Sequence, residues 1–233
     1  MPRFTKLTAT AAPIDLPNVD TDRIIPARFL RKVKDTPGYD RCCFHDVRFR
    51  ADGSENPEFV LNQTPYRGAG ILVANENFGC GSSREAAVWA LQAYGIGSVI
   101  APRLGDIFHQ NCFKNGVLPV ILPADATAAL RRQLHETPGC SVTVDLETQL
   151  VTGPDGTTYF FDVDPFRKQC LLAGQDEIEL TQTHEQAITA FEQRSRTEFD
   201  WLTVHISGPE WPPIPPTLGS APAAVALLGI ALG

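Results

Sequence analysis

The sequence lacks the features that mark chains which bind nucleic acid or cross a membrane. It contains no run of five or six charges of one sign, and its formal net charge at pH 7 is −7, from 20 Lys and Arg against 27 Asp and Glu. Such a balance argues against a basic groove for nucleic acid and against a polybasic membrane patch. The apolar run at residues 223–233 is far shorter than the roughly 20 residues that a membrane-spanning helix needs. We therefore expect no nucleic acid and no membrane among its partners.

Cysteine patterns for metal binding are also missing. The six cysteines include no CxxC pair, and no Cys and His residues stand at a spacing that suits zinc or an iron–sulfur cluster. We predict reduced, mostly buried thiols and no metal held by this chain. Residues 1–20 lack a continuous apolar stretch and carry Asp15 and Asp20, unlike a secretory signal, so the predicted location is the cytoplasm. The cysteines are Cys42, Cys43, Cys80, Cys112, Cys140 and Cys170.

The middle of the chain alternates short apolar runs with segments of helical composition. The order strand, helix, strand, helix, strand, helix predicts an α/β layered domain with a partly parallel sheet. Glycine or proline follows each helical segment and marks its end. The predicted strands are residues 70–74, 97–101 and 117–122, and the predicted helices are residues 86–94, 104–116 and 124–136.

Less regular segments flank this unit. The opening 35 residues contain "NVDTDRIIP", which we interpret as a loop that enters a brief strand or turn before Pro26. Residues 35–68 are rich in Gly, Pro, Asn and Asp, and we expect loops there with a short helix over residues 38–49. Later segments predict strands at residues 141–147, 149–153 and 157–163, with a hairpin, and helices at residues 165–173 and 183–196.

Length and composition predict one domain with an appendage. A chain of 233 residues that is 43% hydrophobic can bury a full core. We assign residues 1–200 to the domain. Residues 201–233, which are rich in proline and then in small apolar residues, form a predicted flexible tail.

One corner of the sequence carries the most chemistry. In "NENFGCGSSREAAVWAL", residues 75–91, a predicted strand is followed by a glycine turn and then by the start of a helix. The first N–H groups of a helix lack partners within it, and its dipole adds positive charge, so such a corner binds anions. Gly79 and Gly81 permit a tight turn, and Arg84 offers a fork that fits a carboxylate.

Other uses of a glycine-rich corner do not fit these residues. The phosphate-binding pattern GxxxxGK[ST] needs a lysine that is absent, and the dinucleotide pattern GxGxxG is broken by Arg84. The esterase pattern GxSxG requires serine where Gly81 stands. A carboxylate site is therefore favoured over a phosphate or dinucleotide site.

Four segments together resemble one family. "NVDTDRIIP", "NFGCGSSRE", "APRLGDIFHQNCFKNGVLPV" and "VDPFRKQCLLAGQDEIELT" are similar to the small subunits of 3-isopropylmalate dehydratase, in the aconitase family, in order across residues 1–200. The resemblance implies a swivelling β/β/α domain with a mixed sheet. It also implies docking on a large subunit that carries a 4Fe–4S cluster, and isomerisation of 2- and 3-isopropylmalate by dehydration and rehydration in leucine biosynthesis. The tail does not share the resemblance.

The resemblance also implies roles for individual residues. Ser83 matches the family's serine base, and Arg84 and Ser82 match positions that hold a substrate carboxylate. Asp22 matches an acidic position that faces the cleft. The alternatives are structural: Ser82 or Ser83 would cap the helix with Glu85 as first-turn support, and Asp22 would form an Asx turn.

Substrate choice stays open at this stage. Phe29, Leu30 and Arg31 lie where the family places a loop that selects the substrate side chain; an apolar wall would suit an isopropyl group, and a cation would suit a third carboxylate. Ala86 and Val88 stand where many relatives have histidine and proline. The alternatives are a related hydro-lyase subunit acting on homoaconitate, citraconate or a dimethylmalate, or a noncatalytic module that docks a partner or a carboxylate.

Overall fold

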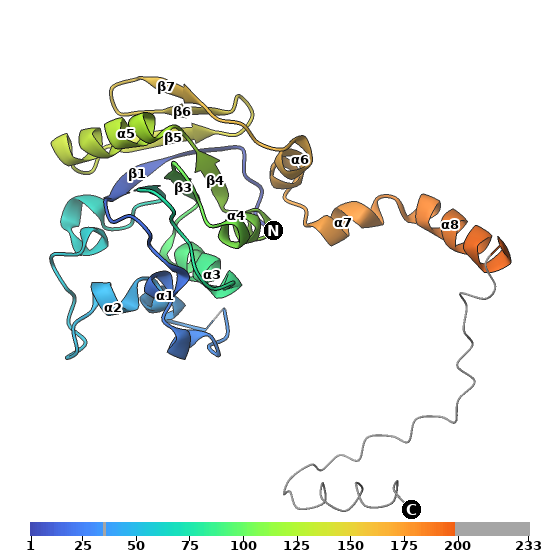
Figure 1. Cartoon of the computed structure of the whole chain (residues 1–233), viewed down its shortest axis with the longest axis horizontal. Coiled ribbons are helices and arrows are strands. Elements are labelled where there is room, and N and C mark those ends of the chain that lie inside the picture. Colours follow the sequence, from blue (N-terminus) through green and yellow to red (C-terminus); the bar gives the residue numbers. More distant parts are fainter. Residues whose placement is uncertain (35, 199–233) are drawn as a thin grey trace, which may run out of the picture. The chain divides into compact units, whose positions relative to one another are not determined.

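A mixed seven-stranded sheet, ordered β4-β3-β2-β1-β5-β6-β7, is the framework of the computed structural model, which describes residues 1–34 and 36–198 (Figure 1). Strands β1 to β4 pair in parallel, and β1, β5, β6 and β7 pair antiparallel. The predicted α/β class with a mixed sheet is therefore confirmed. The strands are β1 (Lys6–Ile14), β2 (Ile71–Ala74), β3 (Ser98–Ala101), β4 (Leu118–Ile121), β5 (Ser141–Asp145), β6 (Leu150–Thr152) and β7 (Thr158–Phe160).

Strand β1 joins the parallel and antiparallel parts of the sheet, and the sequence interpretation missed it. Its residue Ala11 pairs in parallel with Ile71 of β2, and Leu7 pairs antiparallel with Val144 of β5. The strand reads "KLTATAAPI", and alanine and proline are poor strand formers. Pairing on both sides overrides that weak local preference. The sequence interpretation of the opening 35 residues therefore lacks the strand over residues 6–14.

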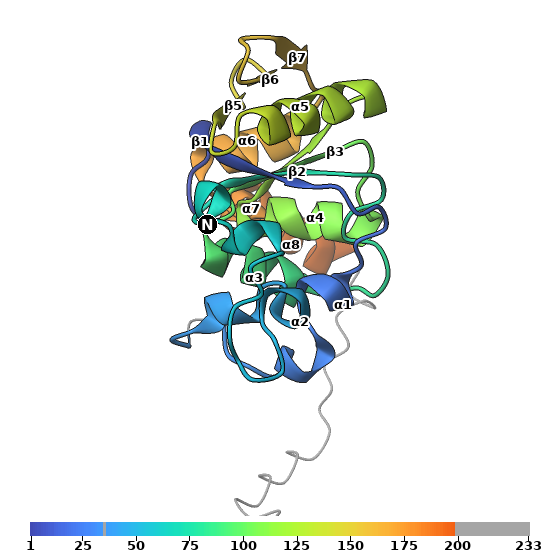
Figure 2. The ribbon, with the colours of Figure 1, turned by 90° about the vertical axis from the view of Figure 1, so that its left-hand side faces the viewer.

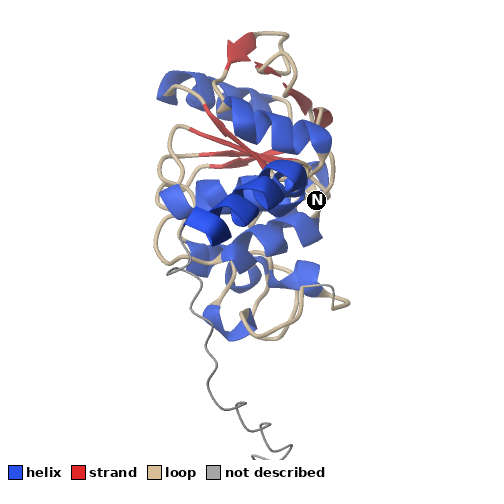
Figure 3. Cartoon of the chain, turned by 90° about the vertical axis from the view of Figure 1, so that its right-hand side faces the viewer, coloured by secondary structure: helices blue, strands red, loops and turns tan. Residues whose placement is uncertain are grey.

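Helices cover both faces of the sheet. Alternate residues of β2 point to opposite sides, so Ile71 and Val73 pack in one hydrophobic cluster and Leu72 and Ala74 in the other. Helix α5 (Ala124–Glu136) lies on the first face, and α3 (Glu85–Tyr94) and α4 (Asp106–Asn115) lie on the second, as Figure 2 shows. Figure 3, from the opposite side, shows helices above and below the strands. Full burial of such a side chain contributes about 1.5–3 kcal/mol, so this double cover provides the core.

The C-terminal helices differ in part from the prediction. Helix α6 (Pro165–Ala173) matches its predicted range. The sequence interpretation missed α7 (Glu177–Gln182), which begins with a capping box between Asp176 and Glu179, and α8 spans Glu185–Glu198. The chain divides into units of residues 1–184 and 185–233. The predicted tail, residues 201–233, lies outside the described residues, and the domain boundary at residue 200 stays a prediction.

Short helices in the chain between β1 and β2, from Thr21 to Tyr66, form what we call the lobe. The segment before Pro26, predicted as a strand or turn, is instead the helix α1, because Asp20 caps it by accepting a hydrogen bond from the Arg23 N–H. The helix predicted over residues 38–49 is two short helices, η2 and α2. The helices are α1 (Thr21–Ile24), η1 (Ala27–Phe29), η2 (Tyr39–Cys42), α2 (His45–Arg48), η3 (Val60–Asn62) and η4 (Thr64–Tyr66).

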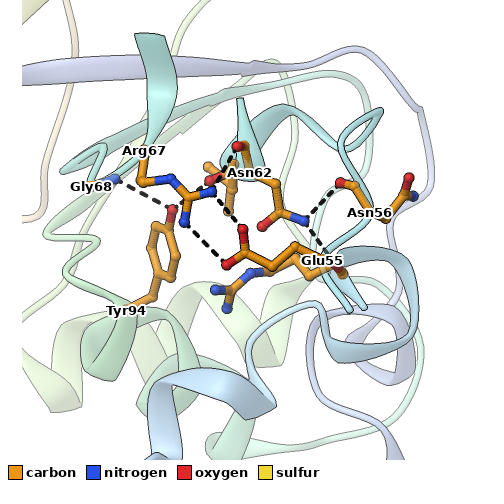
Figure 4. A network of polar contacts seen from close by, with 8 residues as sticks. Glu55, Asn56, Asn62, Arg67, Gly68 and Tyr94 are labelled. Carbon is orange, nitrogen blue, oxygen red and sulfur yellow. Dashed lines mark hydrogen bonds and ion pairs between the residues drawn. The ribbon is translucent and has the colours of Figure 1, made fainter. Parts of the chain in front are cut away.

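Polar contacts tie this lobe together and fasten it to α3 (Figure 4). The guanidinium of Arg67 donates through both terminal nitrogens to the Glu55 carboxylate, at 3.1 and 2.6 Å. The amide of the buried Asn62 donates to the Asn56 carbonyl at 2.8 Å. The hydroxyl of Tyr94, at the end of α3, donates to the Leu61 carbonyl at 2.9 Å. The lobe is therefore a fixed part of the domain.

Two further observations concern the described helices and the cysteines. In residues 1–34 and 36–198, no helix is long and apolar enough to cross a membrane. Four of the six cysteines, Cys42, Cys43, Cys112 and Cys170, are buried, as predicted.

Candidate active site

The turn between β2 and α3, residues 75–84, which we call the glycine corner, lies between two loops at the carboxyl edge of the parallel strands. The Gly79 N–H donates to the Val19 carbonyl at 2.7 Å, and the Thr21 N–H donates to the Cys80 carbonyl at 3.0 Å. On the other side, the Gly105 N–H donates to the Phe78 carbonyl at 2.9 Å. These loops follow β1, β2 and β3, which are neighbours in the sheet. Ligands of open α/β sheets bind at this edge.

Two glycines are needed for the loops to meet. Gly79 has φ +73°, and a Cβ there would lie 2.3 Å from Cγ of Phe108. A Cβ on Gly105 would lie 2.4 Å from the Gly79 carbonyl oxygen. Real Cβ atoms do not approach other atoms so closely, so larger residues would push the corner away from α4.

The two serines stand exposed between the glycine turn and α3. Ser82 and Ser83 are exposed, and the Ser82 backbone is fixed because its carbonyl accepts a hydrogen bond from the Thr21 hydroxyl at 2.9 Å. The N-cap residue of α3 is Arg84, whose side chain makes no capping hydrogen bond within the described structure. The alternative in which Ser82 or Ser83 caps the helix is therefore wrong. Both hydroxyls stand at the positive end of α3.

Arg84 and Asp22 form a bidentate pair at this corner. Nη2 of Arg84 lies 2.7 Å from Oδ2 of Asp22, and Nη1 contacts Oδ1 and, at 3.4 Å, the Ile25 carbonyl. The Arg84 side chain is 14% exposed and that of Asp22 is 54% exposed. The hydrogen bond from Arg84 lowers the pKa of the Asp22 carboxyl below its usual range. A largely buried guanidinium thus presents its fork to a carboxylate that faces solvent.

The first turn of α3 is held from α4, through a residue that the sequence interpretation missed. The Asn115 amide donates to Oε1 of Glu85 at 2.8 Å, and Trp89 Nε1 donates to Oδ1 of Asn115 at 2.9 Å. Glu85 therefore supports the start of α3 by a long-range contact rather than by a capping box. The local sequence around Asn115 carries no signal for this contact.

A cavity of about 260 Å³ opens beside the corner. Ser82 lines it together with the start of α4, including Arg103 and Asp106, which the sequence interpretation also missed. A signal for them was present, because "PRLGDIF" repeats the order of strand, glycine and helix seen in the corner. The lining is Asn77, Gly79, Cys80, Gly81, Ser82, Arg103, Gly105, Asp106, Ile107 and Phe108. Another cavity, of about 280 Å³, is lined from the far end of α4 and contains no predicted site residue.

The predicted substrate-selecting residues lie seven to nine positions after Asp22 along the chain. Phe29 is half-buried, Leu30 is 39% exposed and Arg31 is exposed. They follow Ile25, whose carbonyl contacts Arg84. The described lining of the 260 Å³ cavity does not include these three residues, so their role stays a prediction.

The thiols and carboxylates do not gather into a metal site in the described part of the chain. Across residues 1–34 and 36–198, no three His, Cys, Asp or Glu side chains lie close enough to hold a metal ion. Burial raises the pKa of the Cys43 thiol to about 12, which keeps it protonated and a poor metal ligand.

Known proteins similar to this chain agree with one another. The model of the aconitase C-terminal domain matches residues 1–125, and a model described as LeuD_N matches residues 128–165. The 3-isopropylmalate dehydratase small subunit of Paramagnetospirillum magneticum is 52% identical over 202 residues, which are 87% of this chain and 100% of that protein. The small subunit of Rhodospirillum centenum is 51% identical over 201 residues, covering 86% of this chain and 98% of that protein.

A solved structure is similar in fold. The crystal structure of 3-isopropylmalate dehydratase (leuD) from Methanocaldococcus jannaschii aligns with a TM-score of 0.56 at 26% identity. The alignment covers 79% of this chain and 98% of that one.

Proposed function

The chain belongs to the family of 3-isopropylmalate dehydratase small subunits, and on that premise we propose that its glycine corner is one half of a hydro-lyase active site. The enzyme acts in leucine biosynthesis and isomerises 2-isopropylmalate and 3-isopropylmalate by removing and re-adding water. The small-subunit naming of the relatives implies a large-subunit partner that supplies the other half.

The observation that carries the proposal is the bidentate contact of Arg84 with the Asp22 carboxylate, next to exposed Ser82 and Ser83. The guanidinium has five N–H groups, and the contacts of Arg84 within the described residues use Nη1 and one N–H of Nη2, so a substrate carboxylate can bond the edge formed by Nε and the other N–H of Nη2. Asp22 then orients the guanidinium and does not react. Ser82 and the N–H groups at the start of α3 are placed to hold the same substrate oxygens.

Ser83 is the proposed base. Isomerisation requires removal of a proton from the carbon next to the one that carries the hydroxyl. A serine hydroxyl is a weak base unless its alkoxide is stabilised. Arg84 is the next residue and α3 begins directly after it, and we assign the guanidinium and the positive end of α3 to the stabilisation of the alkoxide. In the rehydration direction the same hydroxyl returns the proton to the other carbon.

We place the metal half of the site on the partner. The described residues offer no donor set for a 4Fe–4S cluster, so the residues here do not fit that group as its carrier. When bound on the large subunit, the cluster would supply the Lewis acid for the substrate hydroxyl. This chain then contributes the carboxylate clamp and the base, and the cytoplasm is the predicted location.

Reconstitution tests the proposal. The full chain is combined anaerobically with a cluster-loaded large subunit and assayed with 2- and 3-isopropylmalate, citraconate, homoaconitate and a dimethylmalate. The expected result is turnover of isopropylmalate by the pair and none by this chain alone. Turnover of a different acid would assign the chain to a related hydro-lyase. Stable assembly without turnover of any of these acids would indicate a noncatalytic module instead.

A further inference from the structure

Two residues outside every sequence motif contact residues 27–31, a segment that contains the predicted substrate-selecting residues 29–31. We propose that His45 and Asp46, at the start of α2, are positioning residues that fix this segment through Arg28 and Phe29 and so determine which substrate side chain is accepted. The inference rests on the proposed function, in which residues 29–31 face the substrate side chain.

The Arg28 side chain is bonded to two residues of α2. Its Nη1 donates to Oδ2 of Asp46 at 3.0 Å, and its Nη2 contacts Oδ1 of the same carboxylate and lies 3.2 Å from Nδ1 of His45. Because both ends of the guanidinium fork are held, Arg28 has a fixed position and orientation. It therefore acts as an anchor of the segment.

The aromatic rings add a second contact between the same two elements. The centroids of the Phe29 and His45 rings are 4.8 Å apart, and the Arg28 guanidinium lies over the Phe29 ring at 4.6 Å. His45 therefore touches both residues, by its ring nitrogen and by its ring face. Leu30 and Arg31 follow directly, so a shift of Arg28 and Phe29 would move them too.

Helix α2 is in turn hydrogen-bonded to α1, the helix that carries Asp22. Phe44, its N-cap residue, is buried and has φ +52°, a left-handed conformation that is strained for phenylalanine. Its N–H donates to the Ile24 carbonyl at 2.7 Å, at the end of the helix that carries Asp22. Within the segment, the Phe29 N–H donates to the Pro26 carbonyl at 2.9 Å and the Leu30 N–H donates to the Ala27 carbonyl at 3.2 Å. The segment therefore follows α1 along the chain and is held by α2 through Arg28 and Phe29.

The ion pair of Arg28 and Asp46 is exposed, so its effect on the position of the segment can be measured apart from its effect on folding stability. The side chains of Arg28 and Asp46 are 53% and 54% exposed, and exposed ion pairs contribute little to stability. Removing Asp46 should thus leave the fold intact and release the segment. The chain offers a matched control, since Arg67 and Glu55 form the same kind of fork in the same lobe at 53% and 43% exposure (Figure 4).

The test compares Asp46→Ala, Asp46→Glu and Glu55→Ala in the reconstituted holoenzyme. For Asp46→Ala, KM for isopropylmalate should rise about 10-fold, the range in which one misplaced apolar contact acts. KM for unsubstituted malate, which has no side chain to place, should change less than about two-fold, with kcat also within about two-fold. Asp46→Glu should recover part of the selectivity, and Glu55→Ala should match the wild type.

Each other outcome overturns the inference. An unchanged ratio of isopropylmalate to malate in Asp46→Ala, or an equal change in Glu55→Ala, would show that α2 does not position the segment. Equal weakening of both substrates would indicate a general structural role. If Asp46→Ala fails to assemble, His45→Gln and Asp46→Asn are measured by the same ratio. A wild-type holoenzyme without turnover would instead overturn the proposed function, and this inference with it.

Discussion

Arg84 and Asp22 lie 62 positions apart in the sequence and share a bidentate hydrogen-bonded pair at the glycine corner. The arginine is largely buried and the aspartate is exposed. This asymmetry matters for function, because a buried guanidinium held by Asp22 keeps its orientation and a second carboxylate can join the pair. The corner therefore holds a carboxylate clamp in place before substrate arrives.

Replacing Arg84 by lysine tests the clamp. An ammonium group is a point charge and cannot form the two-bond fork, so part of the carboxylate contact is lost. Loss of a charged hydrogen bond costs about 1.5–3 kcal/mol, which predicts a KM about 10- to 100-fold higher in the reconstituted enzyme. Steady-state kinetics with isopropylmalate measures this. Unchanged KM and kcat would rule out Arg84 as the substrate clamp.

The Asp22 pair also predicts a dependence of stability on pH. Because Arg84 lowers the pKa of Asp22 below 3.8 in the folded state, the pair stabilises the fold above about pH 4 and ceases to do so as the pH falls through the lowered pKa. Asp22 is more than half exposed, so the contribution is at most about 1 kcal/mol. Urea unfolding of wild type and Asp22→Asn should differ at pH 6, and the difference should become smaller as the pH is lowered below 4. A constant difference would contradict the pairing.

Gly79 should be the least replaceable glycine of the corner. Alanine there combines a positive φ, at about 1–2 kcal/mol, with overlap with the Phe108 ring, at about 1–3 kcal/mol. We expect Gly79→Ala to lower the free energy of unfolding by about 2–5 kcal/mol. Gly53 is the control, since it has φ +82° and open space around its Cβ position, so only the first cost applies. Equal losses in urea unfolding would show that contact with Phe108 is unimportant.

Thiol labelling should report on the cavity. Cys80 is partly exposed and lines the cavity beside Ser82, whereas burial raises the pKa of the Cys43 and Cys112 thiols and keeps them protonated. A maleimide at pH 7.5 should therefore modify Cys80 before the buried cysteines, as peptide mass spectrometry would show. Labelled chain should fail to give active holoenzyme, and labelled Cys80→Ala should remain active. First reaction at Cys43 would contradict the burial described here.

The corner was predictable because its signals are local. A strand, two glycines and a helix start follow one another within residues 71–94, and each leaves its own mark in the sequence. Strand β1 has no such local signal, because its alanines and Pro13 are poor strand formers. It forms through pairing with β2 and β5. The weight of tertiary pairing over local propensity explains that miss.

Long-range contacts account for the other features of the site that could not be predicted from the sequence. A serine before a helix with glutamate after it indicates a cap, yet Thr21 binds the Ser82 backbone and Asn115 binds Glu85, so that local pattern misled. The family resemblance indicated Asp22 and Arg84 separately, and their pairing needed the fold. The contacts of Arg28 with α2 likewise join residues 17 and 18 positions apart, in a lobe with little periodicity to predict them from.

The replacement of Ser83 by alanine in the reconstituted holoenzyme tests the central claim most directly, with Ser141→Ala, an exposed serine in β5, as the control. Positioned general bases contribute about 10²- to 10⁴-fold to rate. We predict a loss of kcat in that range for Ser83→Ala, together with loss of deuterium exchange from solvent into the substrate. Assembly and KM should be nearly unchanged, and the control should be fully active. Near-normal isomerisation by Ser83→Ala would contradict the assignment of the base to this corner.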